Sequence, residues 1–289
     1  MIKHLSSVYG FAIRTLCRYY QISKSRYYYN INKVKSTLDL QQDSYKLDIL
    51  ELGSKYCFYG YRRMGIALRV KYGNNNITNK IVYRLCKELG WKSDIRCKSK
   101  YFASGQSDVS DNLLNQNFKS EHPNSKLVMD ITEISTSEGK YYYTMVLDLF
   151  SLEVLSYNLS NHSKTSLVLD CVKEVVAKHG KFNGAIFHTD RGKQFTSKEF
   201  KTYLDNNGFR ASNSRAGNCL DNSLAENHFS HFKTEYLYRN QILSEKQLRK
   251  GIEGYVYYYN NERRQLKTEK TPVEIREEYY RNQNVFKVV

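Results

Sequence analysis

The sequence predicts a mixed α/β domain preceded by a basic, all-helical region. Residues 1–107 contain 20 Lys and Arg but only 6 Asp and Glu, a net charge of +14, whereas residues 108–289 contain 25 and 23, a net charge of +2. Apolar residues recur at helical spacing in the first part, and strand-like runs alternate with helical ones in the second. A chain of 289 residues can bury at least one core, and we expect two domains.

We place the domain boundaries where the composition changes. The basic helical region covers residues 1–107, a polar linker covers 108–125, the α/β domain covers 126–240, and a C-terminal helical extension covers 241–289. The linker is predicted from a stretch rich in Ser, Asn, Gln and Asp that ends near Pro123.

The overall charge of +16 favours a polyanionic partner, although a solvated basic surface is the alternative. The six cysteines form no CxxC pair, so we expect the reduced thiols of a cytosolic protein. No apolar run approaches the length of a membrane-spanning helix, and the first residues lack a signal-peptide core. These features predict a cytoplasmic protein that has no membrane partner.

The basic part is predicted to be a series of short helices. Residues 6–29 have the pattern of two helices around a turn, which is typical of a helix-turn-helix and equally of an ordinary helical hairpin with a basic face. Further helices are predicted over residues 38–53, 59–73 and 78–90. The candidate contacts to DNA phosphates on the last two are Arg62, Arg63, Lys80 and Arg84. Each is weakly specific alone, because any solvated helix carries such charges.

The second part begins with three strand-like runs and continues with alternating helices and strands. The predicted strands are residues 127–134, 141–149, 153–158, 185–188 and 209–211. The predicted helices are residues 164–178 and 197–206, one starting near Asp221, and one behind the capping box Ser244-x-x-Gln247. Short turns between the first three strands imply an antiparallel meander.

Three carboxylates stand out by their positions. Asp130 lies inside a predicted strand, Asp190 lies where a strand ends and the chain turns, and Glu226 lies on a predicted helix, with 35 residues between it and Asp190. Carboxylates that converge from distant positions hold hard divalent cations through oxygen atoms. Such a site suits phosphoryl transfer, in which a metal pair activates the attacking oxygen and stabilises the leaving one.

These residues and their neighbours resemble a known family. The segment Asp130-Ile131-Thr132, the segment His188 to Phe195, the run Ser214 to Asn222 and the 35-residue gap are similar to those of the DDE transposases. The closest resemblance is to the OrfB proteins of bacterial insertion sequences, whose catalytic core resembles retroviral integrase. It extends from about Tyr9 to about Pro272, nearly the whole chain.

The resemblance implies an RNase H-like fold for the α/β domain. It also implies that Asp130, Asp190 and Glu226 hold two Mg²⁺ or Mn²⁺ ions, cleave the ends of an insertion sequence and join the freed 3′-hydroxyls to target DNA. The expected partners are double-stranded DNA, a second copy of the chain on that DNA, and an upstream helix-turn-helix protein, either as a separate chain or joined by a frameshift. The implied location is the bacterial cytoplasm, in association with the nucleoid.

The resemblance also points to basic residues near the carboxylates. Lys233 shares a helix face with Glu226 and is expected to contact a DNA phosphate, whereas the alternative is a solvent-facing lysine. Arg263 and Arg264 lie in a segment similar to the Tyr-Asn-x-x-Arg signature of the family and are candidate DNA contacts. The chain departs from the family pattern at three places, none of them an expected metal ligand: Leu127 for Trp, Ala216 for Lys and Gln265 for His.

Several nearby residues have simpler interpretations. Asp148 is expected to make structural hydrogen bonds, Glu133 to face the other side of the sheet, and Asp221 to cap a helix. His228 and His231 have the HxxH spacing, but no further His or Cys cluster supports a zinc site.

Two other functions remain open at this point. One is an RNase H-like nuclease that cuts DNA without joining it, and the other is a DNA-binding regulator of transposition that makes no use of the carboxylates. The sequence does not give the terminal repeats, the target preference or the oligomeric state.

Overall fold

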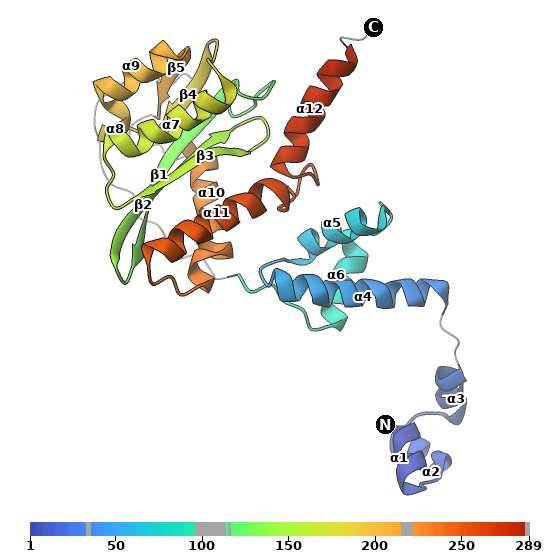
Figure 1. Ribbon diagram of the computed structural model, residues 1–289. Coiled ribbons are helices and arrows are strands. Elements are labelled where there is room, and N and C mark those ends of the chain that lie inside the picture. The colour runs from blue at the N-terminus through green and yellow to red at the C-terminus, as the bar shows by residue number, and fades with distance from the viewer. Residues whose placement is uncertain (33–35, 96–113, 115–116, 215–221, 287–289) are drawn as a thin grey trace. The chain divides into compact units, whose positions relative to one another are not determined.

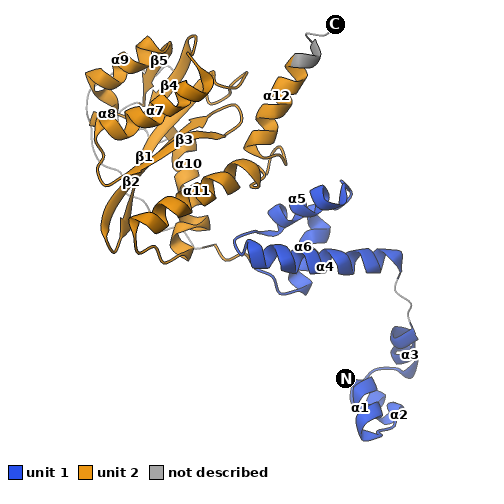
Figure 2. Ribbon diagram, viewed as in Figure 1, with its two compact units in different colours: residues 1–92 blue, residues 93–289 orange. Residues whose placement is uncertain are grey.

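The structure is a computed structural model that describes residues 1–32, 36–95, 114, 117–214 and 222–286. The chain forms two compact units, Met1–Lys92 and Ser93–Val289 (Figure 2). The boundary predicted at residue 107 and part of the predicted linker lie outside the described residues, so these boundaries stay predictions. Among the described residues, no helix is both long enough and apolar enough to cross a membrane.

The first unit begins with three short helices where two were predicted. These are α1 (Ile2–Tyr9), α2 (Ile13–Tyr19) and α3 (Lys24–Asn32). Helix α1 ends at Gly10, whose φ of 69° is the left-handed conformation that glycine adopts readily. Side chains of all three helices form one small core, made of Ile2, Leu16, Cys17 and Tyr27.

The same unit contains a second group of helices, α4 (Thr37–Lys55), α5 (Tyr61–Tyr72) and α6 (Asn79–Glu88), which confirms the three helices predicted there. Ser36 and Asp39 form a capping box at the start of α4, and Thr78 caps α6. Helix α5 packs against α6. The fully buried side chains of this group include Ile49, Met64, Leu68, Val82 and Leu85.

The second unit is built on a five-stranded sheet of order β3-β2-β1-β4-β5 (Figure 1). Strands β1 (Lys126–Thr136), β2 (Gly139–Asp148) and β3 (Val154–Ser160) form the predicted antiparallel meander. Strands β4 (Ala185–Thr189) and β5 (Phe209–Asn213) continue the sheet in parallel with β1. This mixed sheet is the RNase H-like arrangement that the resemblance implied.

Helices cover both faces of the sheet. Helices α7 (Thr165–His179), α8 (Lys193–Thr196) and α9 (Lys198–Asn206) contribute to one core with Leu127 and Met129 of β1. On the other face, α10 (Ser223–Glu235) and α11 (Glu245–Asn261) contribute to a second core with Val128. Neighbouring residues of β1 enter opposite cores because side chains alternate along a strand.

The C-terminal segment belongs to the same compact unit as the sheet. Leu248, Ile252 and Tyr255 of α11 lie in the core that contains Val128 and Tyr143. A short 3-10 helix, Leu237–Arg239, joins α10 to this segment, and a further helix, α12 (Pro272–Phe286), follows it. Helix α11 is therefore packed into the core beside the sheet, and the division of the chain into two units places it in the same unit as the sheet.

Candidate active site

The sheet register brings Asp130 and Asp190 together. Strands β1 and β4 are parallel neighbours, with Val128 opposite His188. Continued by two residues, this register sets Asp130 beside Asp190, and neighbouring strands lie only about 4.8 Å apart. Asp130 stands within β1, whereas Asp190 follows the last residue of β4. The two carboxylates predicted from distant sequence positions thus meet at one end of the sheet.

The turn that carries Asp190 is held by hydrogen bonds on both sides of the carboxylate. The backbone N–H of Gly192 donates to Asp190 Oδ1 at 2.8 Å, and the Asn213 side-chain amide donates to the Asp190 carbonyl at 3.0 Å. A Cβ atom at residue 192 would lie 3.0 Å from Asp190 Oδ1 and 2.4 Å from the Gln194 amide nitrogen. Glycine therefore allows the backbone to approach the carboxylate closely.

A buried histidine fastens β4 to the end of β5. His188 is fully buried, with Nδ1 at 2.9 Å from Ser212 Oγ and Nε2 at 3.0 Å from Ser214 Oγ. The Asn213 amide also donates to Thr189 Oγ1 at 2.9 Å. Ser212 and Asn213 of β5 escaped sequence reasoning, because their partners lie more than 20 residues away and no local spacing marks them.

Glu226 completes the group from the first turn of α10, where its side chain is exposed. Burial raises the pKa of Asp130 to about 8, and the charges of Asp190 and then Glu226 add to that rise. Burial, followed by the charge of Asp190, raises the pKa of Glu226, and burial raises the pKa of Asp190. Each carboxylate is thus penalised for being charged, and the three interact with one another.

Lys233 lies on the same helix and faces the same charges. Burial lowers the pKa of the Lys233 ammonium, while the nearby carboxylates of Asp130 and Glu133 raise it. The half-buried lysine therefore lies within electrostatic reach of Asp130.

The donor set of the three residues is suited to a hard divalent cation. Carboxylate oxygens are the ligands that Mg²⁺ and Mn²⁺ prefer, and a cation would relieve the repulsion that raises the pKa of Asp130. Within the described ranges, however, no three His, Cys, Asp or Glu side chains stand close enough together to hold an ion as they are placed. The three carboxylates therefore suit a divalent cation chemically, although their side chains as placed do not form a metal site.

Comparisons with known proteins decide the family. Two family models, both described as integrase core domain, match residues 120–219 and 226–285. The InsK protein of insertion sequence element IS150 in Escherichia coli K12 is 32% identical over 267 residues, which cover 92% of this chain and 93% of that protein. The chain belongs to the insertion-sequence transposases with an integrase core domain. Its enzyme class is therefore that of the DDE polynucleotidyl transferases.

This transposase is also similar to other proteins. A transposase-like protein of Haemophilus influenzae is 38% identical over 196 residues, covering 66% of this chain and 88% of that protein. The InsF transposase of insertion sequence IS3fB in Escherichia coli K12 is 27% identical, covering 88% and 90%. Among solved structures, the catalytic core domain of HTLV-2 integrase in complex with magnesium is 20% identical, covers 55% of this chain and 99% of that chain, and has a TM-score of 0.45.

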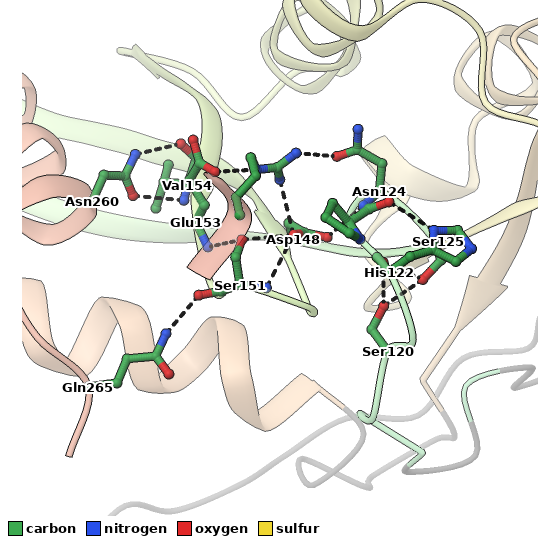
Figure 3. A network of polar contacts seen from close by, with 12 residues as sticks. Ser120, His122, Asn124, Ser125, Asp148, Ser151, Glu153, Val154, Asn260 and Gln265 are labelled. Atoms are coloured by element: carbon green, nitrogen blue, oxygen red, sulfur yellow. Dashed lines mark hydrogen bonds and ion pairs between the residues drawn. The ribbon is translucent and has the colours of Figure 1, made fainter. Parts of the chain in front are cut away.

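Asp148 also stands in a strand of the sheet, but in this transposase its carboxylate makes structural contacts, as predicted. Its side chain is fully buried, and Oδ2 accepts from Arg276 at 3.0 Å and from the Ser151 hydroxyl at 2.8 Å (Figure 3). The backbone N–H of Asn124 donates to Oδ1 at 3.0 Å. Glu153 pairs with the same Arg276, so the network ties α12 to the turn between β2 and β3.

Other predicted details near the site have mixed outcomes. Glu133 pairs with Lys140 at 2.7 Å across the hairpin. Asp221 lies outside the described residues, and α10 begins after Asn222 without a side-chain cap. Gln265, which departs from the family pattern, donates to the Ser151 carbonyl at 2.7 Å (Figure 3). Among the described residues, His228 and His231 belong to no group of three His, Cys, Asp or Glu side chains that could hold a metal ion.

The two C-terminal arginines, which were expected to contact DNA, are both paired with carboxylates of the same chain. Arg263 is 6% exposed and forms a bidentate ion pair with Glu235, and Arg264 forms one with Glu274. Because both guanidinium groups are engaged by carboxylates of the same chain, we leave Arg263 and Arg264 out of the DNA contacts proposed below. The sequence showed two adjacent cations but not their partners.

The four basic residues predicted on α5 and α6 lie on the outside of those helices or near it. Arg62, Lys80 and Arg84 are exposed, and Arg63 is half-buried. Arg84 contacts Gln42 at 2.8 Å, and Arg63 lies over the ring of Tyr59 at 5.8 Å. Arg62, Lys80 and Arg84 are therefore accessible to a polyanion.

Proposed function

We propose that this transposase cleaves the ends of an insertion sequence and joins the freed 3′-hydroxyls to target DNA, with Asp130, Asp190 and Glu226 as its catalytic carboxylates. The observation that supports the proposal is the parallel pairing of β1 with β4, which sets Asp130 beside Asp190, together with the contribution of the Glu226 charge to the raised pKa of Asp130. Membership of the transposase family supports the choice of DNA ends as substrate.

The three carboxylates would hold two Mg²⁺ or Mn²⁺ ions, which when bound supply Lewis-acid activation of the attacking oxygen and stabilisation of the leaving one. The protein contributes placement. Asp130 is fixed by the sheet, and Asp190 is fixed by Gly192 and Asn213. Glu226 is carried by the first turn of α10. No covalent protein intermediate is needed, because water and DNA hydroxyls are the nucleophiles.

We propose that DNA phosphates are contacted near the site by Lys233 and elsewhere by Arg62, Arg63, Lys80 and Arg84. The unit that carries the last four, residues 1–92, contains 17 Lys and Arg against 5 Asp and Glu, a net charge of +12. Such an excess favours binding to a polyanion. Two element ends must meet for joining, so we also propose at least a dimer on DNA, and an upstream helix-turn-helix protein as a partner or a frameshift fusion.

The test is strand transfer by the full chain with a pre-cut DNA carrying the ends of its own insertion sequence, in Mg²⁺. We expect wild-type protein to join these ends to target DNA, and Asp130→Asn, Asp190→Asn and Glu226→Gln each to reduce joining to background while still binding DNA. Asp170→Asn is the matched control, because this carboxylate is 56% exposed on α7 and pairs only with its helix neighbour Lys173 at 3.1 Å among the contacts of the described structure.

Two results would count against the proposal. Joining at the wild-type rate by any of the three variants would remove that residue from the site. Metal-dependent cutting of DNA without any joining of pre-cut ends would favour the nuclease alternative, and protein that binds DNA without cutting or joining it would favour the regulator.

A further inference from the structure

A buried ion pair links the C-terminal segment to α10, the helix that carries Glu226. Glu235 is the last residue of α10, and Arg263 follows the end of α11. Arg263 Nε lies 2.8 Å from Glu235 Oε2, and Nη2 lies 2.7 Å from Oε1. Only 6% of the Arg263 side chain and 9% of the Glu235 side chain are exposed. The Tyr255 hydroxyl donates to the same carboxylate at 3.2 Å.

Stability alone is a poor explanation for this pair. Two charges lose their hydration on burial, and replacing a buried ion pair by apolar residues of similar volume is often neutral or stabilising. A carboxylate at the C-terminal end of a helix is also opposed by the helix dipole. Unlike apolar packing, a bidentate arginine fixes the orientation of its partner. Its planar guanidinium donates two parallel hydrogen bonds to a carboxylate, and this geometry is met in one orientation.

The pair acts on a helix that bears two site residues. Glu226 lies on the first turn of α10 and Lys233 on its last turn, so a roll of the helix moves both with respect to Asp130. A second contact supports the same end of α10. At Gly251 of α11 a Cβ atom would lie 2.2 Å from the Tyr236 hydroxyl, so the absence of a side chain there lets the Tyr236 ring rest on α11.

We propose that Arg263 is a positioning residue for the transposase reaction, which sets the orientation of α10 through Glu235 and so aims Glu226 at the two aspartates. The inference rests on the proposed role of Glu226. It gives the arginine of the Tyr259-Asn260-x-x-Arg263 segment a task inside the protein, in place of the DNA contact expected from sequence.

The test replaces the pair by apolar residues in the full chain. The double variant Arg263→Met with Glu235→Leu keeps the volume of the contact and removes its direction. We expect thermal unfolding within a few degrees of wild type and unchanged DNA affinity. Joining of pre-cut ends should fall about tenfold or more, and the Mg²⁺ concentration for half-maximal rate should rise severalfold. The matched control is Lys270→Met with Glu278→Leu, which removes an ion pair whose side chains are 43% and 47% exposed.

The Mg²⁺ dependence separates positioning from a merely structural role. Unfolding of part of the sample lowers the rate but leaves the Mg²⁺ requirement of the folded molecules unchanged. Arg263→Lys serves as the second variant should the double variant fold poorly, because lysine keeps the charge without the fork. We expect it to fall between wild type and the double variant in both rate and Mg²⁺ requirement.

The inference is overturned if the double variant, or Arg263→Lys where the double variant does not fold, joins DNA with the rate and Mg²⁺ dependence of wild type. It is also overturned if the rate falls with no change in Mg²⁺ dependence. Glu226→Gln in the same assay distinguishes this failure from failure of the proposed function. Joining by Glu226→Gln at the wild-type rate would overturn both, whereas an inactive Glu226→Gln beside a wild-type double variant would overturn the positioning role alone.

Discussion

Replacing Asp148 by asparagine is expected to destabilise the second unit by about 3 kcal/mol. The change leaves the shape of the side chain intact but removes the negative charge opposite Arg276, whose side chain is 11% exposed. Breaking a buried ion pair from one side costs about 3 to 5 kcal/mol. The lower figure applies because Arg276 keeps Glu153 as a second carboxylate partner, and because the remaining oxygen can still accept from Asn124.

The same substitution at Asp130 should have the opposite effect on stability. Burial and the charge of Asp190 raise the pKa of Asp130 to about 8, so a neutral amide relieves a penalty there. In the absence of divalent cations we expect Asp130→Asn to be as stable as wild type or slightly more stable. Two aspartates on adjacent strands would then be told apart by stability as well as by activity.

The assay is thermal and urea-induced unfolding of the full chain in EDTA. For a unit of about 200 residues, a loss of about 3 kcal/mol lowers Tm by roughly 6 to 12 °C. Two measurements would refute the reasoning. One is an Asp148→Asn protein within 1 kcal/mol of wild type, and the other is an Asp130→Asn protein destabilised as much as Asp148→Asn.

Two further predictions concern the DNA contacts. Lys233→Ala should slow joining of pre-cut ends on the order of tenfold to a hundredfold, because charge-assisted contacts contribute about 1.5 to 3 kcal/mol, while Lys233→Arg should keep most of the rate. If Lys233→Ala folds normally and joins DNA within about twofold of the wild-type rate, Lys233 is a solvent-facing lysine that makes no phosphate contact. Combining Arg62→Ala with Arg84→Ala should lower the slope of log affinity against log salt by about two in anisotropy titrations. Lys71→Ala, whose ammonium is paired with Asp48 at 2.8 Å, should leave that slope unchanged, and an equal change in both would argue against the assignment.

Local patterns predicted the five strands of the second unit and the helices α7, α9, α10 and α11, but not α8 or α12. Alternating apolar residues placed β1, which runs from Lys126 to Thr136, and the capping residue Ser244 placed the start of α11. The local chemistry differed in detail, because the Gln247 side chain accepts from Leu243 N–H and not from the capping residue itself. These signals were readable because they involve residues within a few positions of one another.

The candidate site depended on information of another kind. The meeting of Asp130 with Asp190 follows from the parallel pairing of β1 with β4, two strands nearly 60 residues apart in sequence. No spacing rule specifies which strands become neighbours, so the prediction came from the resemblance to a family. The residues that hold the Asp190 turn, such as Asn213, were missed for the same reason.

Arg263 and Arg264 show where sequence reasoning reached its limit. Both are cations in one segment, and nothing local separates a surface arginine from a buried one. Their positions are set by distant carboxylates, Glu235 for Arg263 and Glu274 for Arg264. Charge counted along the chain measures the cations available for DNA, but packing decides which of them remain available.

The end of α11 then gains a coherent interpretation. The Asn260 side chain both accepts from the Val154 N–H at 3.0 Å and donates to the Val154 carbonyl at 2.9 Å, so it pairs with β3 as a neighbouring strand would (Figure 3). Three residues later, Arg263 forms its ion pair with Glu235 of α10. One turn of chain therefore fastens the edge strand of the sheet and the helix that carries Glu226. Because the sheet carries Asp130, any movement of this turn would change the distance between the carboxylates on which catalysis is proposed to depend.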